Sequence, residues 1–342
     1  MSALAPWQRR QVDAALRALA EGRLGHALLL AGPPALGKRD VAEVLAQRLL
    51  CATPGADGLA CGQCRGCRQF PEQKVGLASA QAHPDLQRVG LEPNEKGDKL
   101  RTEISVDQVR RLGQWLALTP QLGGPQVAII DPADLMNNAS ANALLKTLEE
   151  PSPNRFLLLV TSRPGRLPAT IRSRCQRLDF RLPPREESLA WLVGHGLPGA
   201  AGAAALDAAR GNPGLARTWA QEGSLGERDE VARSLNAIAS GRAAPVETAQ
   251  AWLGDDRAEL RLRFAADLAL DVVSAPFAPE RAGGLTAPPD FSRLPSWFDA
   301  VNRVREQLRA PLRNDLVLAG LLLEWRSLFE AAGPGRHNEE RR

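Results

Sequence analysis

The chain is short of aromatic residues and of long apolar runs. It has no Tyr and only 8 Phe in 342 residues, so an aromatic platform for stacking nucleic-acid bases is not expected. No apolar run approaches the roughly 18 residues that a membrane-spanning helix needs. The first 30 residues lack the basic start, apolar stretch and cleavage site of a signal peptide. We therefore expect a protein that works in the cytoplasm.

What is present fits a globular protein of more than one domain. A content of 44% hydrophobic and 24% charged residues is typical of soluble proteins, and the length favours two or three domains. The net charge of +4 permits contact with nucleic acid but does not require it. Five cysteines in a cytosolic chain favour metal or redox chemistry over a disulfide framework.

Short apolar runs bounded by Gly, Pro or Asp predict strands that are buried on both faces. These runs are residues 26–32, 126–131 and 156–162. Helical periodicity lies before and between them, at residues 8–21, 38–51 and 106–118. Strands that alternate with helices predict a parallel α/β sheet with right-handed crossovers. In such a sheet, ligands bind at the carboxyl ends of the strands.

The composition changes after Phe180, where Pro183 and Pro184 interrupt the chain and an Ala- and Leu-rich helical pattern follows. We predict three domains from this change. An α/β domain covers residues 1–181, a small helical domain covers 182–226, and an all-helical domain covers 227–342, with a disordered tail at its end.

The stretch "GPPALGKRD", residues 32–40, resembles a phosphate-binding loop directly after the first predicted strand. Gly32, Gly37 and Lys38 match the first three marked positions of G-x-x-x-x-G-K-[ST], but Arg39 stands at the fourth. In such a loop, backbone N–H groups and the lysine hold the phosphates, and the hydroxyl binds Mg²⁺. The loop therefore retains groups for weak nucleotide binding and lacks a metal ligand.

A second nucleotide-site feature is "QVAIIDPADLM", residues 126–136. An apolar strand that ends in an acid is typical of hydrolysing P-loop proteins, and Asp131 has that place. Those proteins usually carry a glutamate next, where this chain has Pro132. An aspartate that merely ends a strand gives the same pattern. Together with Arg39, however, Pro132 means that two catalytic groups are absent, which argues against ATP hydrolysis.

The cysteines form the strongest chemical signal. Cys61, Cys64 and Cys67 follow a C-x₂-C-x₂-C spacing, and Cys51 lies ten residues upstream, so that the four fall within residues 51–67. Four thiolates can close a tetrahedral, structural Zn²⁺ site. The alternatives are ordinary reduced cysteines, an iron–sulfur cluster, or a site in which His83 replaces Cys51.

Two further stretches contain charged residues that could have a function. "ASANALLKTLEEP", residues 139–151, predicts an amphipathic helix, and Glu149 and Glu150 can simply form its solvated face. "LPATIRSRC", residues 167–175, contains Arg172 and Arg174. A rigidly held guanidinium can stabilise a transferring phosphoryl group, in its own site or in that of a neighbour. A run of arginines can equally be a solvated or phosphate-contacting surface.

The order of these motifs resembles the clamp-loader ATPases of the AAA+ class, in particular the bacterial subunits. The resemblance rests on "PWQRRQ", "GRLGHALLL", "CGQCRGC", "HPD", "ANALLKTLEEP" and "SRC", and it is dense over residues 1–182 and thin beyond 215. It implies a RecA-like AAA+ domain, a small helical lid and an all-α C-terminal collar that holds the subunits together.

The resemblance also implies a role and partners. Clamp loaders are five-subunit rings of motor (gamma or tau), delta and stator subunits that place a sliding clamp on primed DNA. Arg39, Pro132 and Gly214 fit the non-hydrolysing stator, since motor subunits carry a lid arginine where Gly214 stands. Thr161 matches the polar residue that ends the sensor strand. In the family, the arginine of the SRC motif reaches into the ATP site of the adjacent motor subunit, and the resemblance implies this role for Arg174.

Two other functions remain as alternatives. The first is an ATP-hydrolysing motor subunit whose Mg²⁺ is held by other groups, and Mg²⁺-dependent hydrolysis by the isolated chain would reveal it. The second is a zinc-dependent DNA-binding protein that uses the cysteine loop and the arginines, for which DNA affinity would fall steeply with salt. We expect no catalysis from the isolated chain.

Overall fold

The computed structural model describes residues 4–70, 83–94, 96–97, 99–275, 284–288, 291–308 and 313–330. The chain divides into two compact units, Met1–Arg217 and Thr218–Arg342. The three-domain boundaries expected from the sequence stay a prediction. The tail for which we expect disorder lies outside the described residues.

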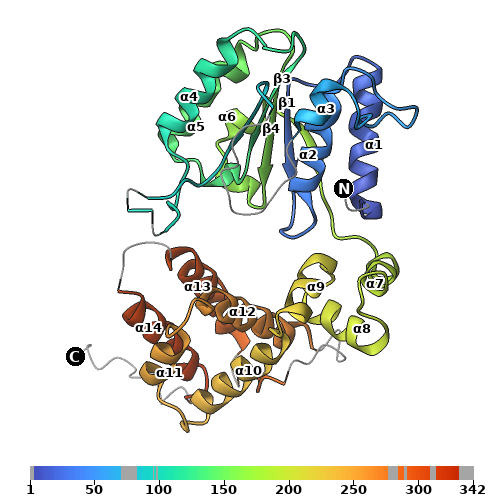
Figure 1. Cartoon of the computed structure of the whole chain (residues 1–342). Helices are drawn as coiled ribbons and strands as arrows, with labels where there is room; N and C mark the ends of the chain where they lie inside the picture. Colours follow the sequence, from blue (N-terminus) through green and yellow to red (C-terminus); the bar gives the residue numbers. More distant parts are fainter. Residues whose placement is uncertain are drawn as a thin grey trace, which may run out of the picture. The chain divides into compact units, whose positions relative to one another are not determined.

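The first unit is built on a five-stranded parallel sheet (Figure 1). The strands are β1 (Ala27–Ala31), β2 (Leu86–Val89), β3 (Gln126–Ile130), β4 (Arg155–Thr161) and β5 (Gln176–Asp179). Their order in the sheet is β2-β3-β4-β1-β5. In the central register, Leu29 of β1 lies opposite Leu159 of β4 and Arg177 of β5. The predicted parallel α/β fold is confirmed.

Helices cover both faces of this sheet, as Figure 1 shows. On one face are α1 (Pro6–Ala20) and α2 (Lys38–Leu49), and on the other are α4 (Val106–Ala117), α5 (Asn138–Glu149) and the short α6 (Ala169–Arg172). Side chains of β1 alternate between the two cores. Leu28 and Leu30 pack with α1 and α2, whereas Leu29 packs with α4 and α5. The buried strands therefore have no polar alternation.

Smaller elements complete the first unit. They are α3 (Arg65–Gln69), the 3₁₀ turns η1 (Ala133–Leu135) and η2 (Pro164–Arg166), and the helices α7 (Arg185–Val193), α8 (Gly199–Ala208) and α9 (Pro213–Gln221). The α9 helix begins in the first unit and ends in the second. These last three helices lie within residues 182–226, for which the small helical domain stays a prediction.

The described part of the second unit is helical. Its α-helices are α10 (Leu225–Ala239), α11 (Pro245–Trp252), α12 (Ala258–Ser274), α13 (Leu294–Gln307) and α14 (Asn314–Ser327), and a 3₁₀ turn η4 (Phe291–Arg293) precedes α13. Two buried tryptophans tie the helices together. Trp297 Nε1 donates to Leu321 O and Trp325 Nε1 donates to Leu235 O, both at 2.9 Å. No helix among the described residues is long and apolar enough to cross a membrane.

Candidate functional site

The phosphate-binding loop lies at the carboxyl end of β1 and leads directly into α2. Its first glycine is required by close packing. A Cβ atom on Gly32 would lie 2.2 Å from the carbonyl oxygen of Phe180, which follows β5. The loop closes at Gly37, whose φ of 75° is in the left-handed region that favours glycine. The predicted strand–loop–helix arrangement is present.

Lys38 is buried, and its ammonium group is hydrogen-bonded to its own loop and to Ser162. Its Nζ donates to Gly32 O at 2.8 Å, to Pro33 O at 2.6 Å and to Ser162 Oγ at 3.1 Å. Burial lowers the pKa of Lys38 to about 8, against the opposing effect of Asp131 and Asp134. The ammonium group thus holds the loop in shape before any ligand is considered.

Arg39 faces the acid at the end of β3. The Arg39 guanidinium, through Nε, donates to Asp131 Oδ2, and the two form an ion pair. In hydrolysing P-loop proteins, the residue at the position of Arg39 and the strand-end aspartate together hold one Mg²⁺ ion. In this chain, the positive charge next to Asp131 belongs to a side chain.

Thr161 is buried at the end of β4 and is hydrogen-bonded within the first unit. Its Oγ1 donates to Asp134 Oδ1 at 2.7 Å, and the Ser162 N–H donates to the same oxygen at 3.2 Å. Sequence reasoning missed Asp134 and Ser162. Their signal was their position next to strand ends, where a parallel sheet gathers its polar groups.

The start of α9 packs directly on the phosphate-binding loop. Asn212 Nδ2 donates to Pro34 O at 2.9 Å. A Cβ atom on Gly214 would lie 1.7 Å from Ala35 O, so only glycine allows this approach. Gly214 is the position at which the resemblance implies a lid arginine in motor subunits. The helix start therefore occupies space next to the loop that a longer side chain would need.

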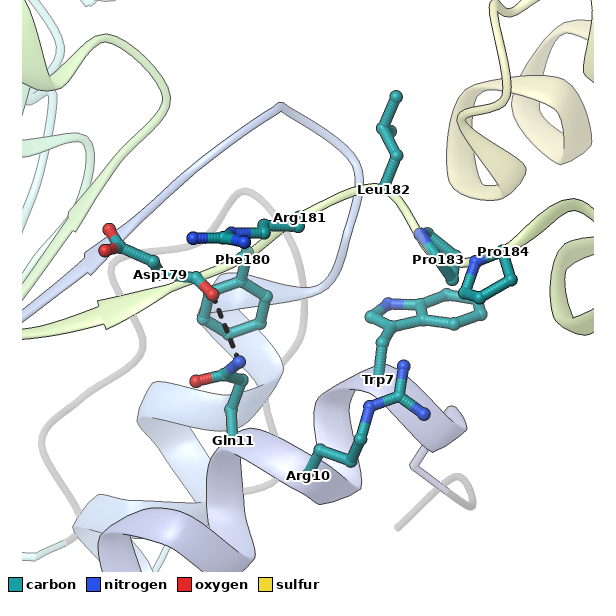
Figure 2. Close-up of a pocket in the computed structure, with 9 residues that line it drawn as sticks. All are labelled: Trp7, Arg10, Gln11, Asp179, Phe180, Arg181, Leu182, Pro183 and Pro184. Atoms are coloured by element: carbon teal, nitrogen blue, oxygen red, sulfur yellow. Dashed lines mark hydrogen bonds between the residues drawn. The ribbon is translucent and has the colours of Figure 1, made fainter.

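The segment between β5 and α7 is held against α1. Figure 2 shows Pro183 and Pro184 beside the ring of Trp7, in a pocket that Arg10 and Gln11 also line. Gln11 Nε2 donates to Asp179 O at 3.1 Å. Trp7 Nε1 donates in turn to Leu36 O of the phosphate-binding loop at 3.0 Å. The indole thus links the loop to the segment that leads into α7.

The SRC segment, residues 173–175, lies at the amino-terminal ends of the strands, whereas the phosphate-binding loop lies at their carboxyl ends. Arg174 precedes β5, whereas the phosphate-binding loop follows β1, and these two neighbouring strands are parallel. At about 3.3 Å per residue, the five residues of β1 separate the two edges by roughly 16 Å. Arg174 is therefore remote from the phosphate-binding loop of its own chain.

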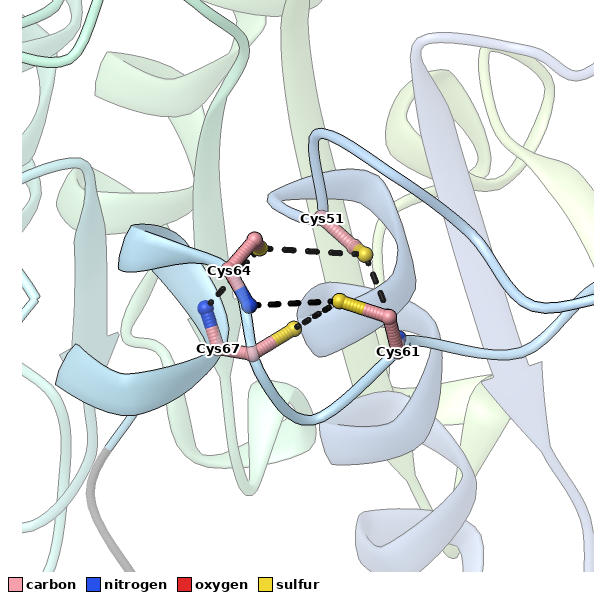
Figure 3. A group of neighbouring side chains, drawn as sticks. All are labelled: Cys51, Cys61, Cys64 and Cys67. Carbon is pink, nitrogen blue, oxygen red and sulfur yellow. Dashed lines mark hydrogen bonds between the residues drawn. The ribbon is translucent and has the colours of Figure 1, made fainter.

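The four predicted cysteines come together at the end of α2 and the start of α3, as Figure 3 shows. The sulfur atoms of Cys51, Cys61, Cys64 and Cys67 all lie within 4.8 Å of one another. His83 is buried near Gly66 but does not belong to this group. The arrangement favours Cys51 over His83 as the fourth ligand.

Backbone N–H groups point at these sulfurs. Cys61 N donates to Cys51 Sγ at 3.3 Å, Cys64 N donates to Cys61 Sγ at 3.3 Å, and Cys67 N donates to Cys64 Sγ at 3.5 Å. The Thr53 hydroxyl and the N–H groups of Gln63 and Cys64 lower the pKa of Cys61 to about 6. Such donors stabilise thiolates, the form of cysteine that binds metal. The site fits one tetrahedral metal ion with four sulfur ligands.

The fold and these sites define an α/β domain with a parallel sheet and a phosphate-binding-like loop after β1, followed by helices. A family model described as "DNA polymerase III, delta subunit" matches residues 7–184. The subunit delta′ of DNA polymerase III from Pseudomonas aeruginosa is 38% identical over 74% of this chain and 72% of its own length. The Escherichia coli K12 subunit delta′ is 32% identical over 93% of this chain and 94% of its own length. The chain belongs to the family of DNA polymerase III delta′ subunits.

A solved structure of a gamma subunit-related protein of DNA polymerase III from Thermotoga maritima aligns over 93% of this chain and 99% of its own. The TM-score is 0.48 and the identity is 18%. At this distance the match adds nothing to the assignment.

The contact between α9 and the loop generates a stability prediction. We expect Gly214→Arg to lower the free energy of unfolding by about 1–3 kcal/mol, because the new side chain forces α9 away from Ala35. Urea denaturation of the full chain measures the change. Gly226→Arg is the matched control, because Gly226 is exposed and a Cβ there meets nothing within 4 Å. An equal effect of both substitutions would contradict the prediction.

Proposed function

We propose that this chain is the non-hydrolysing subunit of the clamp loader that places the sliding clamp on primed DNA in the bacterial cytoplasm. Its partners are the motor (gamma or tau) and delta subunits in a five-subunit ring. Its chemical contribution is Arg174, which stabilises the transferring phosphoryl group in the ATP site of the adjacent motor subunit. One observation carries the proposal: Arg174 is partly exposed at the edge of the sheet opposite its own phosphate-binding loop.

The geometry of the chain's own loop supports the absence of hydrolysis. Arg39 pairs with the acid that would face Mg²⁺. Pro132 follows that acid and has no carboxylate to orient water. Gly214 brings no charge to the phosphates. Three groups that support hydrolysis are therefore missing from one site, whereas Lys38 and both glycines remain.

The decisive variant is Arg174→Ala in the reconstituted loader. An arginine finger accelerates phosphoryl transfer about 10³- to 10⁵-fold, so the adjacent site should slow to that extent while the other motor sites keep their rates. A single-turnover ATPase assay with clamp and primed DNA should then lack one site's share of product. Arg177→Ala, three residues away and exposed, is the control and should behave like wild type. Unchanged hydrolysis in Arg174→Ala would refute the assignment.

The pair between Arg39 and Asp131 suggests how the loop treats nucleotide. We propose weak binding that gains nothing from Mg²⁺, because a guanidinium already neutralises Asp131 and position 39 carries no hydroxyl to bind the ion. Backbone N–H groups of the loop and Lys38 would contact the phosphates.

Nucleotide titrations test this proposal. The isolated wild-type chain should bind fluorescent ADP with the same affinity in Mg²⁺ and in EDTA and should show no Mg²⁺-dependent ATP hydrolysis. Arg39→Ser supplies a hydroxyl and frees Asp131, so its nucleotide affinity should rise when Mg²⁺ is added. Wild-type binding that requires Mg²⁺ would contradict the role given to Arg39.

The cysteine group supports a structural Zn²⁺ ion with Cys51, Cys61, Cys64 and Cys67 as its ligands. All four tetrahedral positions are filled by sulfur, so no position is open for water or substrate. The ion would fix the turn between α2 and α3, a segment that has few buried apolar residues of its own.

Metal analysis tests the zinc proposal. The purified chain should contain about one zinc ion and should show no visible absorption from an iron–sulfur cluster. Cys64→Ser should lose more than half of the zinc and unfold at a lower temperature. Cys175→Ala should retain the metal, because Cys175 lies outside the group. Full zinc content in Cys64→Ser, or a visible iron–sulfur spectrum, would exclude the four-cysteine zinc site.

A further inference from the structure

Two stretches that are far apart in the sequence meet at the amino-terminal edge of the sheet. Arg174 Nη2 lies 2.8 Å from Glu149 Oε1, and Arg174 Nη1 donates to Thr170 O at 3.0 Å. Glu149 is the last residue of α5, and Thr170 belongs to α6. The guanidinium is therefore held at two points by two different helices.

Both helices are fixed to the same core. Leu144 and Leu148 of α5 and Ile171 of α6 are buried in one apolar cluster, which also contains Cys175, the residue after Arg174. Arg174 N donates to Ile171 O at 3.1 Å. The backbones on both sides of the ion pair are thus well anchored, and the pair sets only the direction of the Arg174 side chain.

We propose that Glu149 is a positioning residue that orients Arg174 toward the ATP site of the adjacent subunit, an inference that rests on the proposed function of Arg174. A guanidinium has five N–H donors. Glu149 and the Thr170 carbonyl engage two of them, which leaves three for phosphoryl oxygens. The carboxylate holds the guanidinium in one place, so that less motion is lost when the transition state forms.

The exposure of the ion pair indicates that losing Glu149 should affect catalysis and not folding. The side chains of Arg174 and Glu149 are 37% and 49% exposed, and exposed ion pairs contribute little to stability. Glu150, the next residue, is also exposed, and the structure describes no ion pair between it and Arg174. The two glutamates therefore form a matched pair of test and control positions.

The experiment compares Glu149→Ala, Glu149→Gln, Glu150→Ala and Arg174→Ala in the reconstituted loader with clamp, primed DNA and ATP. At the adjacent site, Glu149→Ala should lower kcat by about 10- to 100-fold, as expected for a misplaced catalytic group, with KM unchanged. Glu149→Gln keeps an acceptor oxygen and should recover part of that loss. Glu150→Ala should match wild type, and all four variants should assemble and unfold as wild type does.

The outcomes separate the two proposals. A wild-type kcat in Glu149→Ala together with a reduced kcat in Arg174→Ala overturns the positioning role and leaves the finger intact. A wild-type kcat in Arg174→Ala overturns the proposed function itself. A change in KM alone, or an equal loss in Glu150→Ala, also overturns the positioning role, because it would indicate a general disturbance of α5.

Discussion

Parallel pairing between β1 and β5 decides where each candidate group lies. Because the strands run in the same direction, the loop that follows β1 and the arginine that precedes β5 are on opposite edges of the sheet. One edge collects Lys38, Arg39, Asp131 and Thr161, and the other presents Arg174. A domain of this kind has two functional edges, and each can change without the other. In the proposed function, the edge with the phosphate-binding loop does not hydrolyse ATP, and the edge with Arg174 acts on the neighbouring subunit.

The edge of the sheet that carries the phosphate-binding loop is stabilised by the chain's own groups. Four carbonyls of the phosphate-binding loop accept hydrogen bonds from the side chains of Lys38, Asn212 and Trp7. Buried lone pairs that remain without partners are costly, so these contacts keep the loop folded without help from a ligand. The loop can therefore persist as a tight turn between β1 and α2 even where its chemistry has been lost.

The sequence predicted the central strands and the helices well, because residues such as Leu29 and Leu158 are buried on both faces of the sheet and leave an uninterrupted apolar signal. It did not predict β2 and β5, which are the two edge strands. Their sequences, LQRV and QRLD, are short and at least half polar because one side of each strand has no neighbour to bury it. Periodicity therefore identified the centre of the sheet and not its borders.

The same distinction applies to the candidate site. Spacing alone identified the cysteines and the phosphate-binding loop, since their partners are close in sequence. Asp134 and Glu149 contact residues about 25 positions away, and only the tertiary structure brings them together. The contact between Gly214 and Ala35 was equally invisible, because a missing side chain leaves no pattern.

That contact has a consequence for the history of the subunit. In the proposed function, a serine at position 39 would not by itself give ATP hydrolysis, because position 132 would still lack a carboxylate and position 214 would still lack an arginine. An arginine at position 214 would clash with Ala35 of the phosphate-binding loop. A lineage descended from this chain would therefore need several substitutions to gain hydrolysis, and the one at position 214 would also lower its stability.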